Sequence, residues 1–320
     1  MPLPSNTLPA SLDAGEESLF AQHWAARSAL PLPGQEPGKQ FALHLHRFRE
    51  LVSHPGTQVS RLTAGTSLLG IGCWSPLPWD SQMYGFPAAR MDSVLASSAE
   101  HLLPLLKMSI ASARAAGIRH LIARVDAGDL PYLTALTRLG FELIDGIQTF
   151  SLSLPQSLET SPSIATRLYQ PADLGQILNL ARTAYLFDRF HSDPAIGNDV
   201  ADRINEEWLR NSCSGQAADA VIVAVEEDSV LGYATCKLDT ACRPFLGQSL
   251  GTIVMVATAE SARRRGVAAA CTRAAVDWFQ RHGAGLVQVG TQFRNIPAAR
   301  LYERCGFRIA SNSLTWRLLL

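Results

Sequence analysis

Three consecutive arginines followed by a glycine, R-R-R-G at residues 263–266, are the part of this sequence best suited to binding a charged ligand. A helix that begins directly after such a glycine presents unpaired backbone N–H groups and the positive end of its dipole at the turn. The glycine lets a bulky anion approach the backbone, and the guanidinium groups add positive charge. The turn therefore predicts a phosphate site, with a solvated basic helix start as the alternative.

Apolar periodicity on both sides of the turn indicates the elements that would position it. Residues 253–256 form an apolar run typical of a buried strand, and a second such run covers residues 286–290. After the turn, apolar residues recur at helical spacing on one face of a predicted helix: Val267, Cys271, Ala274, Trp278 and His282. The turn thus lies between a strand and a helix, with another strand beyond the helix.

The rest of the chain is predicted to alternate between helices and strands. Helices are expected at residues 102–116, 131–139, 173–187 with Asp173 as the cap, and 200–211. Strands are expected at residues 67–73, 120–125, from 141 onward, 165–168, 220–225, 230–237, 249–257 and 314–320. A segment rich in proline and serine at residues 154–162 indicates a boundary between two domains.

An internal repeat relates the two halves of the chain. Six residue pairs lie 166 positions apart: Gly117 and Gly283, Asp129 and Asn295, Pro131 and Pro297, Arg138 and Arg304, Gly140 and Gly306, and Phe141 and Phe307. The first copy has S-S-A-E-H-L at residues 97–102 where the second has R-R-R-G-V-A, and Leu136 stands opposite Tyr302. The chemistry is therefore expected in the second copy alone.

Composition limits the classes of function. Of 320 residues, 47% are hydrophobic, and the 28 basic residues equal the 28 acidic ones, so the sequence has no global basic field to attract nucleic acid or a membrane. Six cysteines lie far apart without metal-ligand spacing, which favours reduced thiols and no metal site. Neither a signal peptide nor a membrane span is evident, so a cytoplasmic location is expected.

The motif R-x-x-G-x-A at residues 263–268, followed by Asn295, Tyr302 and C-G-F at residues 305–307, resembles the GNAT superfamily of acyl-CoA-dependent N-acyltransferases. The resemblance covers roughly residues 165–320. It implies an α/β (α+β) fold with a central mixed, mostly antiparallel sheet flanked by helices, and acetyl-CoA as the acyl donor. It also implies donor contacts by these residues: Met255, Val256, Arg263, Arg264, Arg265, Gly266, Val267, Ala268, Ala269 and Asn295.

A looser resemblance, from about residue 70 to the end, links the chain to bacterial TDP-fucosamine acetyltransferases. It rests on L-P-W-D-S at residues 77–81 with Y-G at 84–85, on Arg189 with Phe190, and on Thr291 and Gln292 before Asn295. It implies a degenerate GNAT-like domain at residues 61–155, before the linker (156–163) and the catalytic domain (164–320). It also suggests a nucleotide-linked amino sugar as the acceptor. Residues 1–60 are rich in proline, serine and glycine, so a poorly ordered extension with one or two short helices is expected there.

Direct attack of a neutral amine on the thioester would require an oxyanion donor and an acid for the departing thiolate. Backbone N–H groups near Met255 and Val256 are expected to polarise the carbonyl, and Tyr302 to act as the acid, with a core tyrosine as the alternative. Residues 252–257 contain no carboxylate, so the base is expected in the loop at 188–194, where His191 is the first candidate, or in a water chain.

Acceptor contacts are expected from Arg189, which suits a phosphate, and from Asp193, Thr291 and Gln292. Solvated loop charges are the alternative reading for 188–194. The predicted function is N-acetylation of a small-molecule amine. Acetylation of peptides or other small amines, and a non-catalytic CoA-binding regulatory protein, are the alternatives. Pairing of sheets between subunits would make a homodimer.

Overall fold

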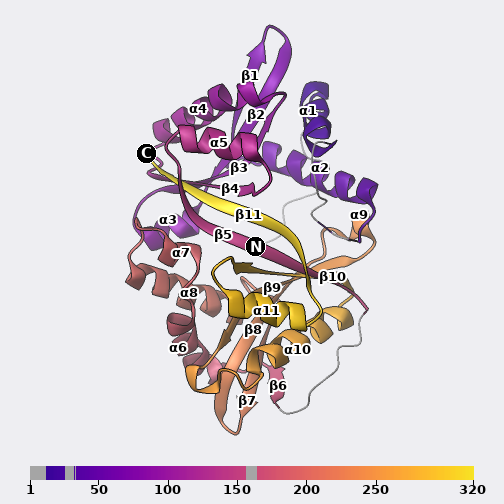
Figure 1. The fold of residues 1–320 in the computed structure, drawn as a ribbon, viewed down its shortest axis with the longest axis vertical. Helices are drawn as coiled ribbons and strands as arrows, with labels where there is room; N and C mark the ends of the chain where they lie inside the picture. Colours follow the sequence, from indigo (N-terminus) through magenta and orange to yellow (C-terminus); the bar gives the residue numbers. More distant parts are fainter. Residues whose placement is uncertain (1–11, 26–31, 33, 156–163) are drawn as a thin grey trace. The chain divides into compact units, whose positions relative to one another are not determined.

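The computed structural model describes residues 12–25, 32, 34–155 and 164–320 (Figure 1). Its described residues divide into two compact units. The first unit comprises residues 12–25, 36–143 and 314–320, and the second comprises 32, 34–35, 144–155 and 164–313. The linker expected at residues 156–163 lies outside the described residues. The division between the units falls inside two strands, β5 (Glu142–Ser153) and β11 (Arg308–Leu319), instead of after residue 155.

Exchange of these two strands explains the division. β5 follows the first repeat in sequence, but its residues Ile147 to Ser153 pair antiparallel with β10 (Ala284–Gln292). β11 follows the second repeat, but it neighbours β4 (His120–Asp126), and the Leu320 N–H donates to the Arg119 carbonyl at 3.0 Å. Each unit therefore completes its sheet with a strand that continues from the other repeat, and a cut at the sequence boundary would leave open strand edges.

Helices cover both faces of the sheet in the first unit. Its elements are α1 (Ala14–Ala25), α2 (Pro37–Ser53), β1 (Gln58–Ala64), β2 (Ser67–Pro76), α3 (Pro78–Tyr84), β3 (Ala88–Ala96), α4 (Ala99–Ala115), β4, α5 (Leu130–Arg138) and the end of β11. β1, β2 and β3 pair antiparallel, and β4 runs parallel to β3. Successive β2 side chains alternate between faces, so Trp74 packs in the cluster of α4 and α5 while Ile71 and Cys73 pack in that of α1 and α2.

The packing of α1 and α2 differs from the poorly ordered, loosely packed extension expected at residues 1–60. Among the described residues, Leu19 of α1 and Leu43 and Phe48 of α2 are 2%, 1% and 5% exposed. Phe48 and Leu19 belong to the same buried cluster as Ile71 of β2. The prolines and glycines of this region suggested an open chain, but apolar residues at helical spacing give α2 a face that the sheet buries.

The second unit has a mixed, mostly antiparallel sheet flanked by helices, as predicted. Its elements besides β5, β10 and β11 are β6 (Ala165–Leu168), a 3₁₀ turn (Pro171–Asp173), α6 (Leu174–Ala184), α7 (Arg189–Ser192), α8 (Asn198–Cys213), β7 (Ala220–Glu226), β8 (Ser229–Asp239), α9 (Arg243–Leu246), β9 (Ser249–Thr258), a 3₁₀ turn (Glu260–Ala262), α10 (Val267–Arg281) and α11 (Ile296–Arg304). β6 to β9 pair antiparallel in sequence order, and β9 runs parallel to β10.

Two helical layers sandwich this sheet. Ile222 and Ala224 of β7 pack in the cluster of α10 and α11, whereas Val223 between them packs in the cluster of α6 and α8. Figure 1 shows α6, α7 and α8 on one side of these strands and α10 and α11 on the other. Asp173 stands at the N-cap position of α6 as expected, but its side chain makes no capping hydrogen bond, because its carboxylate accepts the Gln170 N–H and binds Arg167. In the part of the chain that the structure describes, no helix is both long and apolar enough to cross a membrane.

Candidate functional site

The strands β9 and β10 separate halfway along their length. They pair in parallel from Ser249 to Ile253 on β9 and from Ala284 to Val289 on β10. Beyond these residues β9 stays paired with β8 as far as Thr258, and β10 stays paired with β5 as far as Gln292. The two strands therefore part toward their carboxyl ends, where ligands bind in sheets with parallel strands.

A bulge accompanies this separation. The β8–β9 register shifts between the pairs Cys236 with Ile253 and Ala234 with Val256, so that β9 has one residue more than β8. The Met255 N–H donates to Thr235 Oγ1 at 3.0 Å, and both residues are buried. The Met255 amide is thus committed to the sheet, which leaves Val256 as the candidate of the two to polarise a carbonyl.

The basic turn has an unusual backbone. Gly266 has φ +91°, and Arg264 has φ +64°, a left-handed conformation that costs an L-residue roughly 1–2 kcal/mol. Arg265 forms an ion pair with Glu226 at the end of β7, and Arg263 lies 3.9 Å from Glu260. All three arginines are exposed. Two of the three arginines thus lie beside glutamates, while the Arg264 side chain faces solvent.

The amides of this turn and of the first turn of α10 are unpaired. The Ala270 N–H is the first to donate within the helix, to the Gly266 carbonyl at 2.9 Å. Within the described residues, none of the six preceding amides, from Arg264 to Ala269, donates a hydrogen bond. Six consecutive N–H groups at the positive end of a 15-residue helix can bind an anion such as a pyrophosphate.

Asn295 begins α11. Its Oδ1 accepts the Ala298 N–H at 3.3 Å, and Pro297 occupies the first turn. A side-chain oxygen at this position satisfies an orphan N–H of the helix. The carbonyl oxygen of Asn295 is therefore used by the helix, and a contact with a bound donor falls to the rest of the side chain.

Tyr302 lies on α11 in an aromatic environment and is 4% exposed. Its ring centroid is 5.8 Å from that of Phe150 and 6.1 Å from that of Phe307. Burial raises the pKa of Tyr302, so its hydroxyl stays protonated at neutral and moderately alkaline pH. A phenol that stays protonated has a proton available for a thiolate as it leaves the carbonyl carbon.

Two further tyrosines, which the sequence did not single out, lie near Tyr302. Tyr185 at the end of α6 and Tyr233 of β8 share a hydrogen bond of 3.1 Å between their hydroxyls. Burial raises the pKa of Tyr185, and the neighbouring Tyr233 and Tyr302 contribute to that rise, so the three phenols lie within electrostatic reach. Their positions in the sequence carry no common motif, and only the packing of three distant elements brings them together.

His191 is held by a network of acidic side chains. Its Nδ1 is 2.9 Å from Asp188 Oδ2, and its Nε2 is 3.1 Å from Asp202 Oδ1. Asn205 also donates to Asp188 Oδ2, at 2.9 Å, and Asp188 caps α7. Both ring nitrogens are occupied, so neither can accept a proton from a substrate amine. This arrangement argues against His191 as the catalytic base and gives it a structural role between α7 and α8.

The predicted acceptor residues differ in accessibility. Asp193 is 1% exposed, and its Oδ1 accepts the Ala195 N–H at 3.0 Å, so it supports the turn after α7. The guanidinium of Arg189 lies 4.2 Å from the ring centroid of buried Phe190. Thr291 is buried and Gln292 half-buried at the end of β10. Arg189 and Gln292 are thus the more accessible of the four.

Arg294, which sequence reasoning missed, connects the two predicted acceptor segments. It donates to Ser192 Oγ at 2.7 Å and lies 5.8 Å from the ring centroid of Phe187. It therefore ties the loop around α7 to the turn between β10 and α11, next to Asn295. The structure thus brings residues 187–192 and 291–295 together, although about 100 residues of sequence separate them.

The buried thiols near this site suit packing better than chemistry. Cys271 is 0% exposed, and burial raises the pKa of its thiol to about 12. Burial also raises the pKa of Cys305. A thiol is nucleophilic only as the thiolate, so neither cysteine is poised to attack a thioester.

Comparisons with known proteins identify a family and relatives to which this chain is similar. Residues 177–307 match the acetyltransferase (GNAT) family. The chain is 26% identical over 257 residues to the spore coat polysaccharide biosynthesis protein SpsD of Bacillus subtilis. The aligned residues cover 77% of this chain and 82% of that protein. It is 24% identical over 239 residues to the dTDP-fucosamine acetyltransferase of Escherichia coli, and this alignment covers 74% of this chain and 94% of that protein.

Among solved structures, the fold is similar to that of a GCN5-related N-acetyltransferase from Sphaerobacter thermophilus. The TM-score is 0.60 at 14% sequence identity, and the alignment covers 98% of this chain and 97% of that one. The likeness extends over both units and confirms the fold class predicted from the motifs.

Proposed function

We propose that this chain is an acyltransferase that moves an acetyl group from acetyl-CoA to the amine of a nucleotide-linked amino sugar, since residues 177–307 match the acetyltransferase (GNAT) family. The observation that carries the choice of donor is the run of six unpaired amides from Arg264 to Ala269. It lies beside the parting of β9 and β10, so one extended ligand could place its phosphates on the turn and its acyl end between the strands.

In the proposed reaction, the neutral amine nitrogen attacks the thioester carbonyl carbon. A C–N bond forms, the C–S bond breaks, the nitrogen loses one proton and the thiolate gains one. The Val256 N–H supports the negative charge that develops on the carbonyl oxygen. Tyr302 supplies the proton to the sulfur, a role that suits a phenol kept protonated by burial.

Removal of the amine proton is assigned to water instead of a side chain of the loop. His191 has both ring nitrogens within hydrogen-bond distance of carboxylates. Asp193 is buried beneath its own turn. The strand residues 252–257 carry no carboxylate. Of the bases considered for this reaction, a water chain therefore remains.

The acceptor assignment rests on the relatives and on the loop around α7. The E. coli relative is named as a dTDP-fucosamine acetyltransferase, and the B. subtilis relative as a polysaccharide biosynthesis protein. Arg189 and Arg294 provide two cations in this loop and in the adjoining turn. Guanidinium groups suit the diphosphate of a sugar nucleotide, which a peptide acceptor lacks.

The experiment is a free-thiol assay with acetyl-CoA and a panel of amines: dTDP-fucosamine, free amino sugars, and peptides with free N-termini. We expect thiol release that depends on dTDP-fucosamine and exceeds that with the unlinked sugars. Faster thiol release with peptides than with dTDP-fucosamine would show that the acceptor is a peptide instead of an amino sugar. Binding of acetyl-CoA without thiol release for any amine would instead favour the regulatory alternative.

A further inference from the structure

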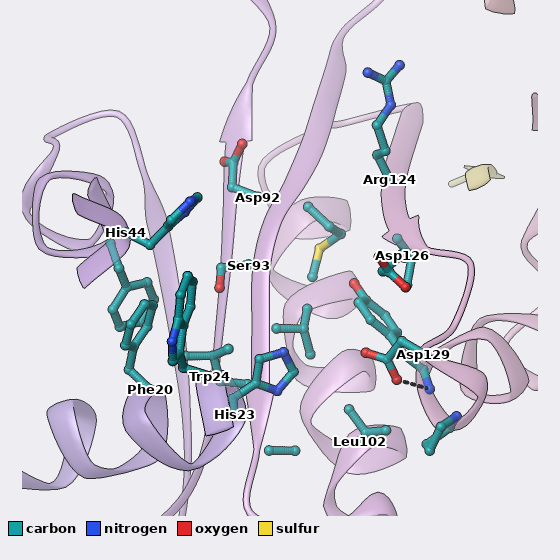
Figure 2. A pocket seen from close by; sticks show the side chains of 18 of the residues that line it. Phe20, His23, Trp24, His44, Asp92, Ser93, Leu102, Arg124, Asp126 and Asp129 are labelled. Atoms are coloured by element: carbon teal, nitrogen blue, oxygen red, sulfur yellow. Dashed lines mark hydrogen bonds between the residues drawn. The ribbon is translucent and has the colours of Figure 1, made fainter. Parts of the chain in front are cut away.

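The first unit contains a parting of strands that matches the one at the candidate site. β3 and β4 pair in parallel only from Ala88 to Met91 and from His120 to Ala123. Beyond them β3 continues to Ala96 beside β2, and β4 continues to Asp126. A pocket of about 580 Å³ lies there, lined by β3, the end of β4, the starts of α4 and α5, and the helices α1 and α2 (Figure 2). This volume is in the range of small-molecule sites.

The turn before α4 in this first-unit pocket is not suited to phosphates. Ser98 precedes α4, and its hydroxyl lies 3.3 Å from Glu100 Oε1 and 3.0 Å from His101 Nδ1. Glu100 places a negative charge in the first turn of α4. Asp129 stands where the second repeat has Asn295. A pyrophosphate would meet acidic side chains where the second unit offers arginines and unpaired amides.

Asp92 of β3 holds a buried carboxylate oxygen at this pocket. Its side chain is 6% exposed, and its Oδ1 accepts from Arg90 Nε at 2.6 Å. Its Oδ2 is buried and has no hydrogen-bond partner among the described residues. A carboxylate oxygen removed from water without a donor is costly, so a ligand that brings an N–H donor would gain from binding here.

The remaining walls carry acidic, aromatic and basic side chains, the basic ones being His23, His44, Arg47 and Arg124. Asp126 Oδ1 accepts the Gly128 N–H at 2.8 Å, and Asp129 Oδ1 accepts the Tyr132 N–H at 3.2 Å. On the opposite side stand Phe20 and Trp24 of α1, whose rings are 6.3 Å apart. Figure 2 shows Asp92 and Ser93 on the strand between the aromatic helices and the turn that carries Asp126 and Asp129. Aromatic faces attract organic cations.

The side chains of this pocket do not favour a metal ion. Within the described residues no group of three or more His, Cys, Asp and Glu side chains could hold a metal ion. Arg47 and Arg124 also line the pocket, and Arg124 Nε donates to Thr315 Oγ1 at 3.3 Å. Ligands with several positive charges would therefore meet repulsion as well as attraction, which favours a single ammonium group.

We propose that the first-unit pocket binds a small organic ammonium compound, with the ammonium group on Asp92 and the apolar part of the ligand against Trp24. This site is separate in sequence and in chemistry from the anion site of the second unit. The parting of β3 and β4 provides its space, and the helices α1 and α2 provide its aromatic wall. The proposal is independent of the acceptor assigned above.

The test is calorimetry on the full chain with phenethylamine, its neutral analogue 2-phenylethanol, and the anion 3-phenylpropionate. We expect phenethylamine to fill one site per chain and to bind at least about tenfold more tightly than the other two, since a hydrogen bond to a charged group is lost in each. Asp92→Asn, which keeps the shape, should weaken phenethylamine at least about tenfold. Asp228→Asn, in the exposed hairpin of the second unit, is the matched control and should not.

Trp24→Leu is a second variant that leaves the carboxylates in place and should also weaken phenethylamine. Thermal melting of each variant shows whether it folds. Equal binding of phenethylamine and 2-phenylethanol, no binding of phenethylamine at millimolar concentration, or full binding by a folded Asp92→Asn variant would overturn the proposal. Binding of two equivalents of acetyl-CoA per chain would overturn it as well, because the second would fill this pocket.

Discussion

The helices α5 and α11 occupy the same position in the two repeats and begin in the same way. Asp129 has φ −81° and ψ 69°, and Asn295 has φ −86° and ψ 62°. Each accepts, through its side chain, the backbone N–H three residues later. Yet Leu136 in α5 is fully buried where α11 has Tyr302. The two repeats thus share the residues that cap the helix, and they differ at the position where the second repeat has the proposed proton donor.

The turns before α4 and α10 show the same contrast. Gly266 and Arg264 have positive φ angles before α10, whereas Ser98 before α4 is extended, with φ −153°. The α10 turn leaves its amides unpaired and places arginines around them, whereas the α4 turn carries Glu100. A strained, cationic turn in one repeat and a relaxed, acidic one in the other are the difference on which the two proposed ligands of opposite charge rest.

The largest effect is expected from Tyr302→Phe, which gives the second repeat an apolar side chain where the first has leucine. The ring keeps its contacts with Phe150 and Phe307, and only the hydroxyl is lost. Turnover should fall roughly 100-fold or more, the usual contribution of a general acid, while the Kd for acetyl-CoA stays within about twofold of the parent. Steady-state kinetics and calorimetry measure the two. Unchanged turnover would remove the hydroxyl from the mechanism.

A matched pair of glycine variants separates strain from ligand binding. Gly266 (φ +91°) and Gly140 (φ +82°) both have positive φ, and a Cβ would contact nothing within 4 Å at either position. Gly266→Ala and Gly140→Ala should each cost roughly 1–2 kcal/mol of stability from the left-handed backbone. Gly266→Ala should in addition weaken acetyl-CoA about tenfold, because its turn holds the unpaired amides. Equal affinity in the two variants would contradict a phosphate site at Gly266.

Asn295→Asp gives α11 the cap residue of α5. Asparagine and aspartate are equivalent caps, so the melting temperature should change little. The added carboxylate beside an anionic donor should weaken acetyl-CoA severalfold, and salt should reduce that effect by screening. Calorimetry at two ionic strengths measures both. A variant that binds as tightly as the parent would place the phosphates away from Asn295.

A separate effect, seen only outside the physiological pH range, concerns alkaline stability, through the three tyrosines that cluster in the second unit. Burial raises the pKa of Tyr185, Tyr233 and Tyr302 above the unfolded value of about 10. The unfolded chain therefore loses these protons first, and the free energy of unfolding should decrease as pH rises above about 10, by about 1.4 kcal/mol per pH unit for each tyrosine. Below that pH their contribution is constant.

Urea denaturation at pH 9, 10 and 11 measures how steeply the free energy of unfolding falls with pH. Tyr233→Phe should reduce that slope by the contribution of one tyrosine, about 1.4 kcal/mol per pH unit. An identical slope in this variant would show that Tyr233 ionises in the folded state as readily as in the unfolded chain. Turnover should meanwhile show no loss between pH 7.5 and 9.5 that is due to deprotonation of Tyr302.

Local signals in the sequence predicted much of the fold. The 166-residue offset maps α5 onto α11, from Leu130 with Ile296 to Arg138 with Arg304. The caps and the glycines that end these helices act within a few residues, so spacing alone reveals them. The same reasoning missed β3, because residues 74–91 combine aromatic and turn-forming residues without clear alternation.

Long-range packing accounts for most of what the sequence did not reveal. His191 was attractive as a base because histidine titrates near neutral pH, but Asp188 and Asp202 occupy its two nitrogens. Asp202 lies 11 residues away on another helix, and nothing in the loop itself indicates the contact. Arg294 and Ser192 are 102 residues apart, and their hydrogen bond is equally invisible in a pattern.

By itself, the sequence determined the basic turn at residues 263–266, the helix and strand around it, the family resemblance and the absence of that turn from the first repeat. Only the tertiary structure decided that β5 and β11 exchange between the units, that α1 and α2 line a pocket, and that Tyr185 and Tyr233 lie near Tyr302. The physical reason is the sequence separation of the interacting residues. Helix caps, dipoles and positive φ angles depend on neighbours in the chain, whereas strand partners, pocket walls and buried polar contacts depend on residues that meet only after folding.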